Sequence, residues 1–214
     1  MDEDFSIINS NTRNEKIKNF FVNNKNKLIY IIIIIIIGVV GAYSFDKYTT
    51  GKQKEISDNY NFTIIEYSQN NKEITAKKLV EIINQKNPTY SPLSLYFIID
   101  NNLITDQTRI NELFDILIEQ TSLDDEIKNL VIYKKALANA DQSTEGDLLN
   151  ILKPLINSES VWKSHGLYLI AEYFYAKDQK QKAKEFFTKI ISLENSNTDI
   201  KLQSEKRLNR DLSE

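Results

Sequence analysis

The chain has 214 residues, a formal net charge of −3 and no cysteine. The missing cysteine excludes disulfide bonds and thiolate metal sites, and the mildly acidic balance gives no electrostatic reason to expect nucleic acid as a partner. The chain has only five glycines and three prolines, which disfavours a sheet-rich fold because such a fold needs many tight turns. Composition therefore predicts an all-α protein.

The first predicted element is an apolar segment at residues 28–45 that carries no charged side chain and includes seven consecutive isoleucines. As a helix it would extend about 27 Å at roughly 1.5 Å per residue, close to the roughly 30 Å hydrocarbon core of a bilayer. Tyr30 and Tyr43 stand near its two ends, where aromatic side chains favour the membrane interface. The segment is therefore predicted to be a single transmembrane helix.

Two other interpretations of this segment remain open. A buried core helix is disfavoured because a helix of a soluble domain is rarely apolar on every face. A cleaved signal peptide is the stronger alternative, since Ala42-Tyr43-Ser44 loosely fits a small-x-small cleavage site. Against cleavage, 27 residues precede the segment, and the segment is longer than the roughly 7–15 apolar residues of a signal peptide.

Basic residues on the two sides of the segment predict its orientation. Residues 1–27 carry five lysines and arginines, whereas residues 46–60 carry three. Basic residues are retained on the cytoplasmic side, so we expect a cytoplasmic tail at 1–27 and a domain at 46–214 on the extracytoplasmic side of the membrane. The whole chain carries −3 and the tail +1, which leaves −4 for that domain.

Within residues 46–214, apolar residues at i, i+3, i+4 and i+7 recur at starting positions 34, 38 and 35 residues apart. Each set forms a stripe on one face of a helix, and regular spacing of this size is typical of helical-hairpin repeats. The four stripes are Ala76-Leu79-Val80-Ile83, Ile110-Leu113-Phe114-Leu117, Leu148-Ile151-Leu152-Leu155 and Ala183-Phe186-Phe187-Ile190.

Partner helices are expected between the stripes, at residues 56–69, 92–103, 125–140 and 160–177, and a charged helix at about 199–212 is expected to cap the last repeat. Ser122 is the predicted N-cap of the 125–140 helix. Pro154 is expected to kink or shorten the helix of the third stripe. The predicted fold is therefore a single transmembrane helix followed by about four helical hairpins and a C-terminal capping helix.

The fourth hairpin resembles a tetratricopeptide repeat. With Ser164 as position 1, the pattern's apolar, small and aromatic positions hold Leu167, Ile170, Ala171, Phe174, Ala183 and Phe187. The sequence departs from the pattern at Asp178 in place of Gly, at Ile190 in place of Ala and at Asn195 in place of Pro. The other three hairpins agree only in spacing and apolarity.

The layout as a whole resembles the ancillary SecYEG translocon subunits of bacteria, the YfgM-like family, which combine a short tail, one anchor and a degenerate tetratricopeptide domain. The stretches Trp162-Lys163-Ser164-His165 and Ser122-Leu123-Asp124-Asp125 carry this likeness. The resemblance implies an inner-membrane location and binding to the translocon and to membrane-anchored periplasmic chaperones, without catalysis.

The residue types offer little support for an enzyme. His165 is the single histidine, and its neighbours Lys163, Ser164 and Glu172 form no recognisable triad or metal-ligand set. Asp124 and Asp125 open a predicted helix, where negative charge favourably meets the helix dipole. We therefore expect no catalytic site, no cofactor and no metal.

A partner-binding groove is the functional site that we expect. In tetratricopeptide repeats, positions 2, 5, 9 and 12 of the first helix usually face the concave surface, and here they are His165, Tyr168, Glu172 and Tyr175. Aromatic side chains beside a charge suit the binding of a peptide or helix, although packing of Tyr168 and Tyr175 on the neighbouring repeat explains them equally well. The sequence thus favours a scaffold for protein export, with a scaffold for envelope or cell-division assembly as the alternative.

Overall fold

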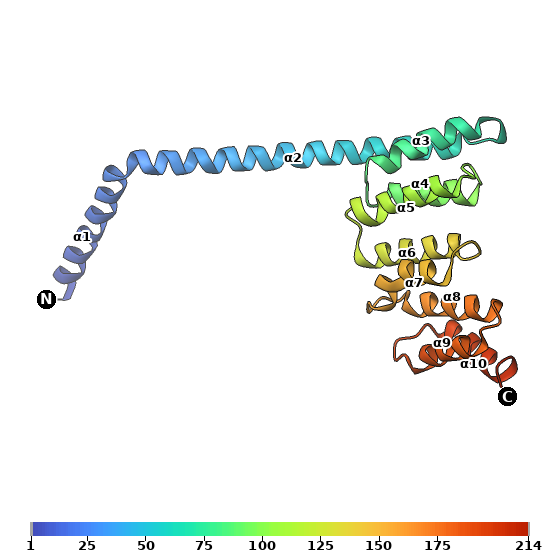
Figure 1. Ribbon diagram of the computed structural model, residues 1–214. Coiled ribbons are helices and arrows are strands. Elements are labelled where there is room, and N and C mark those ends of the chain that lie inside the picture. The colour runs from blue at the N-terminus through green and yellow to red at the C-terminus, as the bar shows by residue number, and fades with distance from the viewer. Residues whose placement is uncertain (1, 214) are drawn as a thin grey trace. The chain divides into compact units, whose positions relative to one another are not determined.

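The structure is a computed structural model that describes residues 2–213, with side chains from residue 13. Within these residues it contains ten α-helices and no strand, which confirms the all-α prediction (Figure 1). The chain divides between Glu55 and Ile56 into two compact units. The two units are described in turn.

The first unit contains α1, Asp2–Asn23, and most of α2, Lys25–Ile65. The most apolar window of α2 has a mean hydropathy of 2.7, and none of it is buried. This exposure is incompatible with a buried core helix, because such a helix must be covered on all sides by other elements. In the described part of the chain, α2 alone is long and apolar enough to cross a membrane.

The helix of the apolar segment does not end where the segment ends. Residues 25–65 form one uninterrupted helix, so the predicted partner helix at 56–69 is the last part of α2 and ends at Ile65. A short 3₁₀ turn at Gln69–Asn71 then leads into α3. No glycine or proline follows Gly51 before this turn, which explains why the helix continues.

The second unit is built from the end of α2 and the helices that follow it. The bounds are α3 Lys72–Asn84, α4 Tyr90–Asp100, α5 Gln107–Asp115, a π-helical turn Ile116–Gln120, α6 Asp125–Asn139, α7 Glu145–Ile156, α8 Lys163–Ala176, α9 Lys180–Ser192 and α10 Thr198–Arg210.

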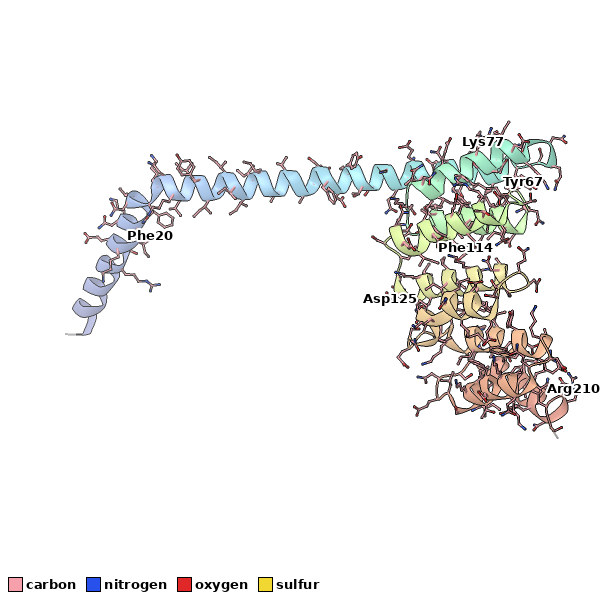
Figure 2. All side chains as sticks on the ribbon, viewed as in Figure 1. Phe20, Tyr67, Lys77, Phe114, Asp125 and Arg210 are labelled. Carbon is pink, nitrogen blue, oxygen red and sulfur yellow. The ribbon has the colours of Figure 1, made fainter. Side chains whose placement is uncertain are left out.

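Consecutive helices of this unit pack on one another, and Figure 1 shows them stacked in chain order from α3 to α10. The four apolar stripes lie in the interior: Leu79, Phe114, Leu152 and Phe187, one from each stripe, are fully buried. Figure 2 shows Phe114 inside the stack. The stripe predictions are therefore confirmed at their central positions.

The core consists of two hydrophobic clusters, one centred on α3–α5 and one on α7–α9. A polar network joins α5 to α6 between them. The amide of the buried Asn139 accepts from Gln107 and exchanges two hydrogen bonds with Asn111, at 2.9 and 2.8 Å. Because both polar atoms of the Asn139 side chain are hydrogen-bonded, the burial of this side chain does not leave an unpaired polar group, which would destabilise the fold.

Three helices end on a residue with a left-handed backbone that is not glycine. Lys86, Asn102 and Asp178 have φ values of 54°, 49° and 57° and follow α3, α4 and α8. At Asp178, the next amide, that of Gln179, returns to the carbonyl of Phe174 at 2.9 Å, as in a Schellman motif. Asp178 thus adopts a backbone conformation that glycine most often supplies after a helix.

The start of α6 and the position of Pro154 in α7 bear on two local predictions. The N-cap of α6 is Asp124, whose side chain accepts from the amide of Glu126 at 3.0 Å, so the assignment of Ser122 was wrong. The carboxylate of Asp124 lies two residues nearer the helix than Ser122 and therefore reaches the free backbone amides of the first turn. Its negative charge is also stabilised at the positive end of the helix dipole. Pro154 lies inside α7, which continues past it to Ile156 and contains the whole third stripe, so the predicted kink or shortening stays a prediction.

Candidate partner-binding surface

The predicted groove residues lie on α8, whose other side is deeply buried. Leu167, Ile170, Ala171 and Phe174 pack into the core. A methyl group added at Gly166 would lie 2.9 Å from Cδ2 of Leu155, a distance too short for two carbon atoms. The glycine therefore permits the close approach of α8 to α7 and fixes which face of α8 points outward.

His165, Tyr168, Glu172 and Tyr175 are all half-buried on that outward side of α8. The structure brings the last three together around Arg207 of α10. The ring of Tyr168 also contacts Phe187 edge-on, with 5.6 Å between the ring centres. His165 stands one turn before Tyr168 on the same side of α8, and its ring contacts Trp162 and Tyr133.

Arg207 makes the central contact of the group. Its Nε and Nη2 donate to the two carboxylate oxygens of Glu172 at 2.8 and 2.7 Å, and its Nη1 donates to Asp211 at 2.9 Å. The guanidinium also lies 4.7 Å from the ring centre of Tyr175, in a cation–π arrangement. The hydrogen bonds to Glu172 and Asp211 raise the pKa of Arg207 further above its usual range.

This network determines what Glu172 and Tyr175 do within the chain. Both side chains hold the C-terminal helix α10 against α8, and burial together with Glu172 raises the pKa of Tyr168. The packing explanation therefore accounts for these contacts, while the binding of a partner here stays a prediction.

The role of Arg207 can be measured. Arg207→Ala leaves the half-buried carboxylate of Glu172 without its fork-shaped donor, while Asp211 keeps Arg210 as a donor. We expect this change to lower the free energy of unfolding by about 1–3 kcal/mol. Urea unfolding of the full chain in detergent micelles, followed by the fluorescence of the single tryptophan, Trp162, gives this value.

Arg210→Ala is the matched control, because it removes an arginine that pairs with Asp211 and leaves the Glu172 contact of Arg207 in place. The Arg210 side chain is 74 % exposed, and exposed ion pairs contribute at most about 1 kcal/mol. Equal losses for Arg207→Ala and Arg210→Ala would show that the Glu172 contact contributes nothing.

His165 belongs to an aromatic cluster between α6 and α8. Its ring centre lies 5.0 Å from that of Trp162 and 5.8 Å from that of Tyr133, and Trp162 stacks on Tyr133 at 6.1 Å. Burial lowers the pKa of His165, and the nearby carbonyl of Val161 partly opposes this effect. The imidazole is therefore kept in its neutral form, as a packing group.

A surface that the sequence did not indicate lies on the other core cluster. A groove of about 480 Å³ runs between α3 and the α4–α5 connection. Its floor is apolar and is made by Ala76, Val80, Leu103 and Ile104; its rim is charged and consists of Glu73, Lys77, Glu81 and Arg109. Figure 2 places Lys77 on the outer side of α3.

The sequence could not reveal this groove because Ala76 and Val80 belong to a stripe whose other members, Leu79 and Ile83, are fully buried. Periodicity identifies an apolar face but does not say how far the neighbouring connection covers it. The α4–α5 connection contributes Leu103 and Ile104 to the floor and leaves the edge of the stripe open.

A larger hollow, of about 640 Å³, lies between the α8–α9 turn and the C-terminal residues 211–213. Its lining combines Lys180, Lys182 and Lys184 with Leu212. Lys182 is already paired with Glu145 of α7 at 2.8 Å. No histidine or carboxylate cluster suited to a metal ion is found in the described residues.

The comparisons with known proteins assign this chain to no family. No family model matches the sequence, no curated protein is similar enough to count as a relative, and no solved structure matches the fold significantly.

Proposed function

We propose that the protein is a single-pass membrane protein whose helical domain is a scaffold for binding other proteins. The observation that supports this most is the combination of an exposed apolar span in α2 with a separately packed helical unit that begins at Ile56. Neither feature requires catalysis. Together they suit a protein that holds binding surfaces near a membrane.

Tethering has a direct physical consequence for such a scaffold. A domain held at a membrane meets membrane-embedded partners at a raised effective concentration, so weak contacts suffice for stable association. The apolar floor and charged rim of the α3 groove have the usual composition of a protein-binding surface, in which an apolar centre is surrounded by polar groups.

We propose further that the second unit is a set of tetratricopeptide-like hairpins. The support is the 34-to-38-residue spacing of the four buried stripes, the packing of consecutive helices, and the left-handed Asp178 at the position of the repeat's glycine. Helical hairpins of this kind expose extended concave surfaces that bind peptides and helices.

As partners we propose subunits of the Sec translocon and membrane-anchored chaperones of the bacterial periplasm, on the basis of the family resemblance. This proposal places the protein in the inner membrane, with the tail of residues 1–27 in the cytoplasm and the domain outside. The five-to-three distribution of basic residues supports this orientation.

Crosslinking in native membranes tests the proposed partners. A photoreactive residue is placed at Lys77 in the α3 groove or at Tyr175 on α8, with Asp141 in the α6–α7 connection as an exposed control. We expect translocon subunits among the proteins that mass spectrometry identifies from Lys77 or Tyr175 and not from Asp141. Recovery of envelope-assembly proteins alone would contradict the export role and favour the other scaffold.

A further inference from the structure

The helix that precedes the membrane span has an exposed apolar face. Ile17, Phe20 and Phe21 stand at i, i+3 and i+4 of α1 and therefore share one side of the helix. They are 47 %, 57 % and 57 % exposed, and no other element of the described chain covers them. Figure 2 shows Phe20 projecting from α1. Such a face in water is unfavourable.

Basic residues surround this face. At 100° per residue, Lys16 and Lys18 fall on its two edges, Arg13 lies one turn earlier on the same side, and Glu15 lies opposite. Residues 13–27 contain five basic residues and one acidic residue. An apolar face bordered by lysines is typical of helices that lie in the headgroup region of an anionic membrane, with their ammonium groups on the lipid phosphates.

The face also lies close to the bilayer along the chain. The amide of Asn24 donates to Phe20 at 3.0 Å and that of Leu28 to Asn24 at 2.9 Å, so helical hydrogen bonds continue through the turn between α1 and α2. Leu28, the first residue of the apolar segment, is seven positions after Phe21, a rise of about 10 Å in a helix. The polar layer on each side of the hydrocarbon core is of similar depth, about 5–8 Å.

We propose that residues 13–23 form an interfacial helix that lies on the anionic, cytoplasmic leaflet. Ile17, Phe20 and Phe21 enter the boundary between headgroups and acyl chains, and the neighbouring lysines bind lipid phosphates. This inference rests on the proposed membrane anchor and goes beyond it, since an anchor alone leaves the tail in water. The occupant of the face is the lipid surface of the bilayer that α2 crosses.

Because the chain contains no cysteine, single cysteines can be introduced and spin-labelled without background. The full chain is reconstituted in vesicles of phosphatidylcholine and phosphatidylglycerol at a ratio of about 7:3, a composition with a negative surface charge. Labels at Phe21→Cys, Glu15→Cys and Ile33→Cys then report on the apolar face, the opposite face and the span. The measured quantity is the oxygen-to-nickel ratio, which is the rate at which the spin label collides with oxygen divided by the rate at which it collides with a nickel complex. Oxygen dissolves in lipid, whereas the nickel complex stays in water.

We expect the oxygen-to-nickel ratio at position 21 to be several-fold higher than at position 15 and below that at position 33. Lys16→Gln combined with Lys18→Gln, or vesicles of phosphatidylcholine alone, should lower the ratio at position 21 several-fold and leave position 33 unchanged.

The same three labels separate the two proposals. Equal, water-like ratios at positions 21 and 15 with a lipid-like position 33 would overturn the interfacial helix and keep the anchor; this is also the result expected if a cytoplasmic protein were the true partner of this face. A water-like position 33 would overturn the anchor itself. If the ratio at position 21 changed neither with the lysine substitutions nor with the charge of the lipid, the role of anionic lipid would be overturned.

Discussion

Replacing Ile34 and Ile37 with lysine should abolish membrane insertion of the chain. Both residues lie near the middle of the segment 28–45 and are exposed along α2. On insertion scales a central lysine costs about 2.5–3.5 kcal/mol, and each lost isoleucine removes roughly a further 0.5 kcal/mol of favourable transfer. Two replacements therefore cost about 6–8 kcal/mol, which exceeds the favourable total of the remaining apolar side chains.

The measurement is the fraction of chain that stays in the membrane pellet after alkaline extraction. The parent chain should remain there, and the double-lysine variant should be extracted. Ile34→Leu with Ile37→Leu is the matched control and should behave as the parent does, because leucine is as apolar as isoleucine. Retention of the lysine variant in the pellet would show that something other than this segment holds the protein at the membrane.

Replacing Phe187 with alanine should strongly destabilise the helical domain. Phe187 is fully buried, contacts Tyr168 edge-on and belongs to the cluster centred on α7–α9. Truncation of a buried phenylalanine removes its transfer free energy and leaves a cavity, at a total cost of about 3–5 kcal/mol. For a domain of this size, that loss lowers the melting temperature by roughly 10 °C.

Phe62→Ala provides the comparison, since Phe62 undergoes the same chemical change while it is 56 % exposed. The ammonium group of Lys78 lies 5.4 Å from the centre of the Phe62 ring, and loss of such an exposed contact should cost less than about 1 kcal/mol. Urea unfolding in micelles followed by Trp162 fluorescence measures both variants. If the two losses were similar, Phe187 would not lie in the core that the structure shows.

The parts of the fold that the sequence predicted are those that depend on hydrophobic periodicity. The isoleucine segment lies within a long exposed helix, and Leu113, Leu152 and Phe187 are buried as their stripes predicted. Periodicity succeeds here because every helix of a helical stack must bury one apolar face against its neighbours.

The sequence was less informative at helix ends and at surfaces. The end of α8 at Ala176 agrees with the predicted 177, but the left-handed backbone of Asp178 and Lys86 was not indicated, because glycine normally supplies that conformation. The contact of Arg207 with Glu172 joins residues 35 positions apart, which no local pattern reveals. The contact of the His165 ring with Tyr133 likewise joins residues of different helices, and the sequence did not indicate it.

The central claim is that residues 28–45 cross a membrane and separate the tail from the helical domain. Single cysteines at Asn14→Cys in α1 and Asp141→Cys in the domain, both at exposed positions, test it with a membrane-impermeant maleimide on spheroplasts. We expect the full-length chain to be labelled at position 141 in intact spheroplasts and at position 14 only after lysis. Labelling of both positions before lysis, protection of both, or labelling of a shortened chain released from the membrane would contradict it.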